Sequence, residues 1–285
     1  MSTGISGGKT GRQGHTGPDL PVITLLTDFG TADYFVAAVK GVILTINPQA
    51  SLVDITHEIP PQDIESGAFT LLTCYCDFPP GTIHMAVVDP GVGSARRPIV
   101  VRAGQYYFVG PDNGLFSYIY DRESRVADRE PPYQVFHVTA SEYFRQPPSP
   151  TFHGRDVFAP VAAALSNGIQ PEALGPRITD PVRLAPLSPS KDESGKLHGR
   201  IIHIDRFGNC ITNFSSDDLA VLERRTLLVN GTSIQTYRQY FTDEHGSKDE
   251  VFAIWGSAGF LELAINRGSA AAALRVNCGT RIVVQ

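Results

Sequence analysis

The stretch that decides the fold reads Ile83-His84-Met85-Ala86-Val87-Val88-Asp89-Pro90-Gly91-Val92-Gly93-Ser94-Ala95-Arg96. Its apolar run, residues 83–88, predicts a short buried strand that ends in the carboxylate of Asp89. A glycine-rich turn follows, and then the guanidinium of Arg96. Ligands of open α/β sheets bind at the carboxyl ends of the strands, so this acid and this cation mark a candidate active site. A salt bridge that only braces the turn is the alternative interpretation.

The sequence on both sides of this stretch alternates strands with helices. Apolar runs at residues 22–26 and 51–55 predict two further strands, and helical periodicity covers residues 32–46 and 63–78. Such alternation is typical of a mainly parallel sheet with helices on both faces. We therefore predict an α/β protein with a Rossmann-like N-terminal domain.

The rest of the chain reads differently. Residues 99–102 and 106–109 predict a hairpin across Ala103-Gly104, and residues 113–120 and 156–165 predict helices. Residues 177–196 have the proline-rich, mixed polar composition of a linker. Short strands dominate beyond it, which predicts a smaller, mainly β, barrel-like C-terminal domain. These strands are expected at residues 199–204, 225–229, 251–254, 260–265 and 281–284.

These patterns divide the chain into four parts. We expect a disordered tail over residues 1–20, the α/β domain over 21–180, the linker over 181–196 and the β domain over 197–285. The length of 285 residues supports two domains, because single cores rarely grow beyond about 250–300 residues.

Composition argues against several classes of protein. A net charge of −5 disfavours binding to nucleic acid or to an anionic membrane. No apolar run approaches the roughly 20 residues that span a bilayer, and residues 1–20 lack the apolar segment of a signal peptide. Cys74 and Cys76 have no second pair at a zinc-ligand spacing, so we expect no metal and buried thiols in a reducing cytoplasm.

Two acidic residues follow the first predicted strand. Asp28 stands at its tip, where a carboxylate can accept both hydroxyls of a ribose; a helix cap is the alternative for this residue. Asp33 falls in the first turn of the next predicted helix, where complementing the helix dipole is the favoured interpretation. No phosphate-cradling glycine motif follows the strand, so a bound nucleoside is expected to carry no pyrophosphate.

A histidine and three polar turns complete the candidate residues. His153 opens a predicted helix beside Gly154, a position suited to proton transfer. In the turn after residue 204, Phe207 can stack on a planar base and Asn209 can bond its edge. Turns at Ser257 and Arg267 bracket another strand in the same way, although each alone is more often only a turn.

Several motifs in order along the chain carry a family resemblance. They are Leu26-Thr27-Asp28-Phe29-Gly30, Asp54-Ile55-Thr56-His57-Glu58-Ile59-Pro60, residues 89–96, Gly110-Pro111-Asp112-Asn113-Gly114, Phe152-His153-Gly154-Arg155-Asp156, Phe207-Gly208-Asn209 and Asn266-Arg267-Gly268-Ser269-Ala270. From residue 22 to the C-terminus the chain resembles the adenosine-forming S-adenosyl-L-methionine (SAM) hydrolases, also called SAM hydroxide adenosyltransferases. These enzymes are relatives of the fluorinase and chlorinase.

The resemblance implies a reaction and an assembly. Water or hydroxide attacks C5′ of the ribose of SAM and releases L-methionine and adenosine, without a cofactor. The family forms homotrimers whose sites lie between the N-terminal domain of one subunit and the C-terminal domain of the next. Its Asp-Arg-His triad falls on Asp89, Arg96 and His153. Arg96 would keep Asp89 ionised, and either Asp89 or His153 can then be the base.

The same matching assigns substrate contacts in both domains. They are Asp28 for the ribose diol; Asp33, Asp205 and Ser257 for the methionine amine and carboxylate; Phe207 and Asn209 for adenine; and the backbone of Arg267, also for adenine.

Two other functions compete with hydrolysis. The family's halogenases have Tyr in place of Asp89, and a carboxylate there would repel a halide at short range. The fluorinase also has Ser in place of Gly154 and a long insertion before the turn at Pro111. Gln62 stands where the fluorinase has a Trp that packs on the ribose, and this difference concerns that contact alone. A SAM- or adenosine-binding module without turnover would keep the nucleoside contacts but break the triad, whereas all three triad positions are intact here.

Overall fold

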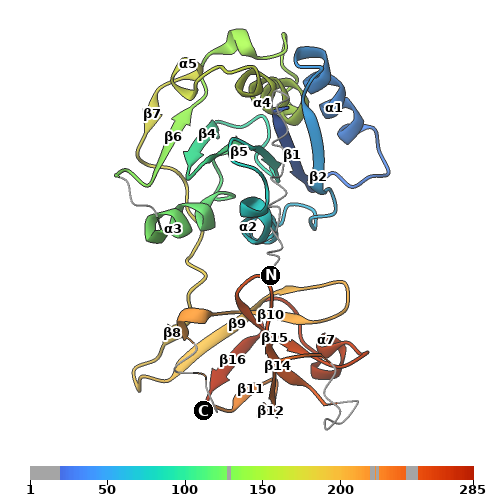
Figure 1. The fold of residues 1–285 in the computed structure, drawn as a ribbon, viewed down its shortest axis with the longest axis vertical. Helices are drawn as coiled ribbons and strands as arrows, with labels where there is room; N and C mark the ends of the chain where they lie inside the picture. The colour runs from blue at the N-terminus through green and yellow to red at the C-terminus, as the bar shows by residue number, and fades with distance from the viewer. Residues whose placement is uncertain (1–19, 127–129, 219–221, 223–224, 242–249) are drawn as a thin grey trace, which may run out of the picture.

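The chain folds around two β-sheets, one in each half (Figure 1). The computed structural model describes residues 20–126, 130–218, 222, 225–241 and 250–285. The tail expected over residues 1–20 therefore lies outside the described residues, except for Leu20. In the part of the chain that the structure describes, no helix is long and apolar enough to cross a membrane.

The N-terminal sheet has seven strands in the order β2-β1-β3-β5-β4-β6-β7. Their bounds are Val22–Thr27 (β1), Ser51–Thr56 (β2), Ile83–Val87 (β3), Pro98–Ala103 (β4), Tyr106–Pro111 (β5), Tyr133–His137 (β6) and Arg177–Ile178 (β7). Strands β2, β1, β3 and β5 pair in parallel, as alternation with helices predicts. The remaining pairs, β5–β4, β4–β6 and β6–β7, are antiparallel. The expectation of a mainly parallel, Rossmann-like sheet is thus only partly met, because the β4–β5 hairpin reverses the chain within the sheet.

Helices cover both faces of this sheet, as expected (Figure 1). Helices α1 (Phe35–Ile46) and α4 (Ala159–Ser166) pack in one apolar core, which includes Val39, Ile43 and Val161. Helices α2 (Ile64–Cys74) and α3 (Ser117–Val126) pack in a second core on the other face. Short helical turns stand at Tyr75–Asp77, Ser141–Tyr143, Gly154–Phe158 (a π-helix) and Pro171–Leu174 (α5).

Helix α3 starts later than the sequence predicts, because a side chain and a glycine hold the preceding segment as a turn. Helix α3 begins at Ser117 rather than at residue 113. The side chain of Asn113 donates to the carbonyl of Val88 and accepts from the N–H of Leu115. Gly114 has a φ of +101°, which a right-handed helix excludes. These contacts hold the segment as a turn.

The C-terminal sheet has nine strands and curls into a half-barrel. Eight follow the order β12-β11-β16-β9-β10-β15-β14-β13, and β8 pairs with β9. Their bounds are Ser190–Lys191 (β8), Leu197–Ile204 (β9), Cys210–Ser215 (β10), Leu227–Val229 (β11), Thr232–Ile234 (β12), Tyr237–Arg238 (β13), Phe252–Trp255 (β14), Phe260–Ala264 (β15) and Arg281–Val284 (β16). The five predicted strands correspond to β9, β11, β14, β15 and β16. A short helix, α7 (Ala270–Leu274), precedes β16, and the 3₁₀ turn Ser216–Asp218 follows β10.

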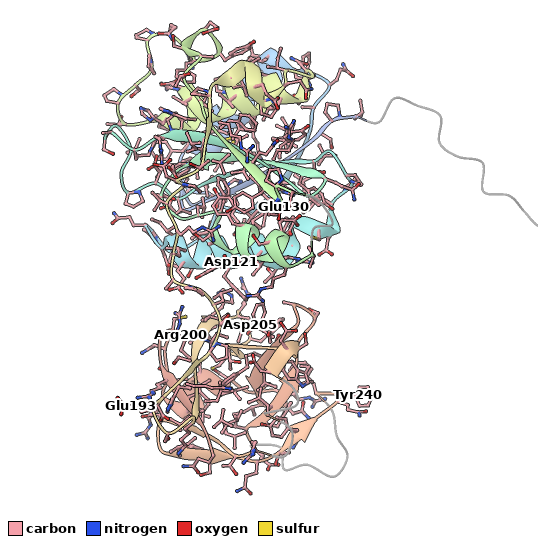
Figure 2. All side chains as sticks on the ribbon, turned by 90° about the vertical axis from the view of Figure 1, so that its left-hand side faces the viewer. Asp121, Glu130, Glu193, Arg200, Asp205 and Tyr240 are labelled. Atoms are coloured by element: carbon pink, nitrogen blue, oxygen red, sulfur yellow. The ribbon has the colours of Figure 1, made fainter. Side chains whose placement is uncertain are left out.

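The two halves meet where α2 and α3 face β9. Arg200 of β9 pairs with Glu65 of α2, and the hydroxyl of Tyr118 donates to the same carboxylate at 3.0 Å. The ring of Phe69 lies 5.5 Å from both His203 and Phe260, between ring centres. Beside this contact a cleft of about 590 Å³ runs between the domains. Figure 2 places Arg200 and Asp205 on the edge of the C-terminal domain that faces the N-terminal domain.

Candidate active site

Asp89, Arg96 and His153 meet at the carboxyl end of β3. Arg96 Nε donates to Asp89 Oδ1 at 3.0 Å, and Arg96 Nη2 donates to Asp89 Oδ2 at 2.5 Å. The same Nη2 lies 2.8 Å from His153 Nδ1. The Asp89 and Arg96 side chains are 5 % and 9 % exposed. The pair is thus a nearly buried, forked ion pair that also holds a histidine, which is more than a brace across a turn.

The turn after Asp89 brings His153 to the ion pair. Gly93 has a φ of +77°, and a Cβ at this position would overlap the carbonyl oxygen of Pro150. The Asp89–Arg96 turn therefore packs against the segment that carries His153, and only glycine permits this approach.

A buried carboxylate fixes the segment on its other side. Asp156 is fully buried and accepts a hydrogen bond from the N–H of Ser149 at 2.8 Å. The guanidinium of Arg155 donates to both oxygens of Asp156. His153 stands at the start of the π-helix Gly154–Phe158, which also contains Asp156. The contacts of Asp156 therefore anchor the short helix that carries His153.

The environment of His153 favours the neutral ring. Burial lowers the pKa of His153 below its ordinary 6.5, and the nearby charge of Arg96 lowers it further, although Asp89 and Asp156 act in the opposite direction. An arginine side chain can only donate, so Nδ1 must accept the hydrogen bond from Arg96. The neutral ring therefore carries its proton on Nε2.

Asp28 joins the triad in a small pocket. Asp28, Asp89 and His153 line a cavity of about 150 Å³, together with apolar residues that include Phe29, Phe35 and Phe152. Asp28 Oδ2 accepts a hydrogen bond from the N–H of Gln62 at 2.8 Å. Helix α1 has no side-chain cap, so the helix-cap interpretation of Asp28 is wrong.

Asp33 lies outside this pocket. It is exposed, in a bend, and α1 begins only at Phe35 with Tyr34 as its N-cap residue. The expectation that Asp33 stands in the first turn of the helix is wrong, because the helical pattern starts three residues later than residue 32.

The C-terminal candidates gather on neighbouring turns. Asp205 Oδ1 accepts from the N–H groups of Phe207 and Asn209, and its Oδ2 accepts from Asn209 Nδ2 at 2.8 Å. The ring of Phe207 is 75 % exposed at the tip of this turn. Gly208 packs against Ser269 and accepts from the N–H of Ala271, which places the turn of Arg267 beside it.

Ser257 belongs to another hollow. It is exposed in the turn between β14 and β15 and lines the cleft between the domains, together with Arg122 and Arg125 of α3. The described lining of the 150 Å³ pocket comes from the N-terminal domain alone, so in one chain the structure brings the triad together with Asp28 but not with the C-terminal candidates.

Sequence reasoning missed the aromatic and supporting residues of the site. The guanidinium of Arg96 lies over the ring of Phe158, 5.1 Å from its centre, and Phe29 and Phe152 pack edge to face at 6.0 Å. Phe29 and Phe152 stand in motifs quoted for the resemblance, but a single aromatic residue carries no local signal that it lines a pocket. His57 and Gln62, which contact the loop of Asp28, stand in or beside a quoted motif that had no assigned role.

Among the described residues, no group of three or more His, Cys, Asp and Glu side chains is placed to hold a metal ion.

Both halves of the chain match models of one family. Residues 23–175 match the SAM hydroxide adenosyltransferase N-terminal domain, and residues 199–283 match the C-terminal domain of that name. The chain belongs to the SAM hydroxide adenosyltransferase family. The resemblance read from the motifs is thereby confirmed.

Relatives within the family include both hydrolases and fluorinases. A protein of Methanocaldococcus jannaschii named (R)-S-adenosyl-L-methionine hydrolase is 38% identical over 270 residues, which cover 90% of this chain and 93% of that protein. A fluorinase of Actinoplanes sp. is 29% identical over 297 residues, covering 93% of this chain and 97% of the fluorinase. A crystal structure of an uncharacterized conserved protein from Thermotoga maritima superposes with a TM-score of 0.81 at 34% identity, covering 92% of this chain and 99% of that one.

Proposed function

We propose that this protein hydrolyses SAM to adenosine and L-methionine. The observation that carries the proposal is the forked ion pair of Asp89 and Arg96, with His153 attached, at a pocket that Asp28 shares. Family membership supports the substrate, and the relative named a hydrolase is more similar than the fluorinase. The proposed reaction needs no cofactor.

The reaction is a substitution at C5′. The oxygen of water forms a bond to C5′ while the bond from C5′ to sulfur breaks and its electron pair passes to sulfur. The sulfonium leaves as a neutral thioether, so no acid is needed for the leaving group. The water gives a proton to a base, and the base later releases that proton to solvent. The protein has to place the water in line and accept that proton.

The hydrogen bonds divide these tasks between Asp89 and His153. Nδ1 of His153 is occupied by Arg96 and its Nε2 carries the proton, so the ring can donate to the water oxygen. Each oxygen of Asp89 accepts one N–H from Arg96 and keeps a second lone pair. We therefore assign Asp89 as the proton acceptor and His153 as the group that orients the water.

We assign the substrate contacts from the positions of this chain that match the family's motifs. Asp28 takes the ribose diol; Asp33, Asp205 and Ser257 meet the methionine amine and carboxylate; Phe207, Asn209 and the backbone of Arg267 hold adenine. Both oxygens of Asp205 already accept hydrogen bonds within its own turn, so a contact with the amine would use a remaining lone pair.

We further propose that the site is completed by a second subunit of a homotrimer. A cavity of about 150 Å³ is smaller than the 300–1,000 Å³ typical of pockets for ligands of this size. An aromatic ring that is 75 % exposed at a turn tip, as Phe207 is, fits a surface that another subunit covers. The C-terminal domain of one subunit would thus close the pocket of the next.

We also propose how the chain divides into domains, where the protein works and what it does not bind. The chain is divided at residues 180 and 197, with a linker between them. The protein works in the cytoplasm, which agrees with four cysteines that form no disulfide. It binds neither nucleic acid nor membrane, which agrees with its net charge of −5.

Product analysis tests the proposed function and separates it from its two rivals. The protein is incubated with SAM in buffer without halide, and then with concentrated chloride or fluoride. Equal amounts of adenosine and methionine in all buffers support hydrolysis. A 5′-halo-nucleoside that grows with halide would identify a halogenase, and binding of SAM without any product would identify a binding module.

A further inference from the structure

The motif Asp54-Ile55-Thr56-His57-Glu58-Ile59-Pro60 has no role in the mechanism above, yet it lies directly behind Asp28. His57 is 5 % exposed, and its Nδ1 lies 2.8 Å from the hydroxyl of Thr27, the residue before Asp28. The Thr27 hydroxyl in turn accepts the N–H of Phe29 at 3.2 Å. The side chain of Thr27 and the N–H of Phe29, on either side of Asp28, are therefore linked to one imidazole ring.

The backbone of the same residue holds the loop a second time. The carbonyl of His57 accepts the N–H of Gly30 at 2.8 Å, and the N–H of Ile59 reaches the carbonyl of Thr27 at 3.4 Å. Gln62, at the end of this segment, donates its N–H to the Asp28 carboxylate. Residues 57–62 thus contact the Asp28 loop before, at and after the carboxylate.

A charged pair orients the ring from its other side. His57 Nε2 lies 3.1 Å from Asp54 Oδ1, without the alignment of a regular hydrogen bond, so the contact is mainly electrostatic. Lys40 Nζ holds the other oxygen of Asp54 at 2.6 Å. A carboxylate facing Nε2 favours the proton on that nitrogen, which leaves Nδ1 to accept the hydroxyl proton of Thr27.

We propose that His57 is a positioning residue for substrate: it fixes the Thr27–Gly30 loop so that the Asp28 carboxylate meets the two ribose hydroxyls. This inference rests on the proposed role of Asp28 in SAM hydrolysis. It assigns His57 no contact with the substrate. Its expected effect is therefore confined to recognition of the ribose diol.

A second histidine–threonine pair on the same strand provides a matched control. His84 Nδ1 lies 2.8 Å from the hydroxyl of Thr24, and both side chains are fully buried. Thr24 and Thr27 both belong to β1, but Thr24 lies within the sheet and Thr27 at its carboxyl end. Loss of either imidazole removes the same kind of buried contact, a histidine nitrogen against a threonine hydroxyl. Only the pair at the strand end borders Asp28.

The test compares adenosine with 2′,3′-dideoxyadenosine, which lacks both hydroxyls, in calorimetric binding to the full-length protein. In His57→Ala we expect the preference for adenosine to fall about tenfold, the scale of one hydrogen bond to a charged group. His57→Asn, whose side chain can still meet the Thr27 hydroxyl, should recover most of the preference. His84→Ala should keep the wild-type preference even if its melting temperature falls.

Three results would overturn the inference. The first is an unchanged preference in His57→Ala, and the second is an equal loss in His84→Ala. The third is a wild-type protein that binds both nucleosides equally, because Asp28 would then not read the diol. If His57→Ala fails to fold, Thr27→Val and its rescue Thr27→Ser replace it with the same expectations. A wild-type protein that distinguishes the nucleosides but leaves SAM intact would contradict only the proposed hydrolysis.

Discussion

Arg96 and His153 share a hydrogen bond of 2.8 Å, between Nη2 of the guanidinium and Nδ1 of the imidazole. The same nitrogen of Arg96 also donates to Asp89. One guanidinium group thus fixes the geometry of the carboxylate and the tautomer of the histidine. This relationship gives each member of the triad a distinct role that substitution can test.

Asp89→Asn should abolish most turnover while leaving nucleoside binding nearly intact. The amide keeps the shape of the side chain but cannot accept the proton of the attacking water. General-base catalysis typically contributes about 10²–10⁴-fold, and we expect kcat to fall on that scale. Single-turnover kinetics and adenosine titration check this prediction. An equal loss of adenosine affinity would mean that Asp89 holds the substrate.

Arg96→Lys should lower kcat about 10²-fold although it keeps the positive charge. Lysine presents a single ammonium group and cannot bind both oxygens of Asp89 and His153 at once. A kcat within a factor of about three of the wild type would contradict the assigned geometry. Arg97→Lys is the matched control, because Arg97 also pairs through two nitrogens with a buried aspartate, Asp112, but lies outside the triad and outside the segment that carries His153.

The acidic limb of the pH profile should lie below pH 6.5. Burial and Arg96 lower the pKa of His153 from its ordinary 6.5, so the active neutral ring persists to lower pH than a free histidine. Protonation would remove the acceptor of the Arg96 hydrogen bond. A limb at or above pH 6.5 would contradict this assignment, as would its persistence in His153→Gln, whose amide does not titrate.

The lowered pKa of His153 also makes the free energy of unfolding depend on pH. The unfolded chain takes up the proton of His153 more readily than the folded chain, because its folded pKa is the lower one. This group therefore begins to destabilise the fold as the pH falls through 6.5, and its effect is complete below the folded pKa. Urea unfolding of wild type and His153→Gln across this range measures the difference.

Gly93→Ala should damage both the fold and the site. The left-handed backbone costs an alanine about 1–2 kcal/mol, and the new Cβ would displace the carbonyl of Pro150 and with it His153. Gly81→Ala is the control, since Gly81 has a φ of +86° but open space around its Cβ position. We expect similar backbone strain in both variants and a large loss of kcat only in Gly93→Ala. Equal kcat values would show that the Gly93 contact does not position His153.

Mixed trimers test whether two subunits form one site. Phe207→Ala should lower kcat/KM about 10–100-fold, the scale of stacking between a base and an aromatic ring. Co-refolding this variant with Asp89→Asn would combine an intact N-terminal domain with an intact C-terminal domain from the neighbour. About a quarter of the wild-type activity should return if the two halves of each site assort independently. Activity that only equals the sum of the separate variants would place each site within one subunit.

Local patterns made Asp89, Arg96 and His153 separate candidates, because they follow a predicted strand or open a predicted helix, and the family resemblance joined them into a triad. Asp28 and Asp89 were each placed at the end of a predicted strand, and because the carboxyl ends of parallel strands meet at one edge of a sheet, the two residues line one pocket. The parallel half of the sheet followed from the same periodicity. Of the antiparallel half, the hairpin of β4 and β5 was predicted. Strands β6 and β7 were not, because they are short and pair over long separations with no local signal.

Other features were hidden for different reasons. The contact of His57 with Thr27 spans 30 positions, and nothing in the local pattern of either residue indicates the other. Asp33 was placed one helical turn too far into α1, because residues 32–34 have no proline or glycine to mark the true start. The exposure of Phe207 is a tertiary property of its turn and cannot be read from composition.

The most direct test is SAM turnover in ¹⁸O-labelled water, with mass analysis of the adenosine formed. Attack of water at C5′ predicts one labelled oxygen, at the 5′ position, together with unlabelled methionine. Adenosine without the label would contradict the account, because its 5′ oxygen would then have come from a source other than the water that Asp89 and His153 are proposed to activate.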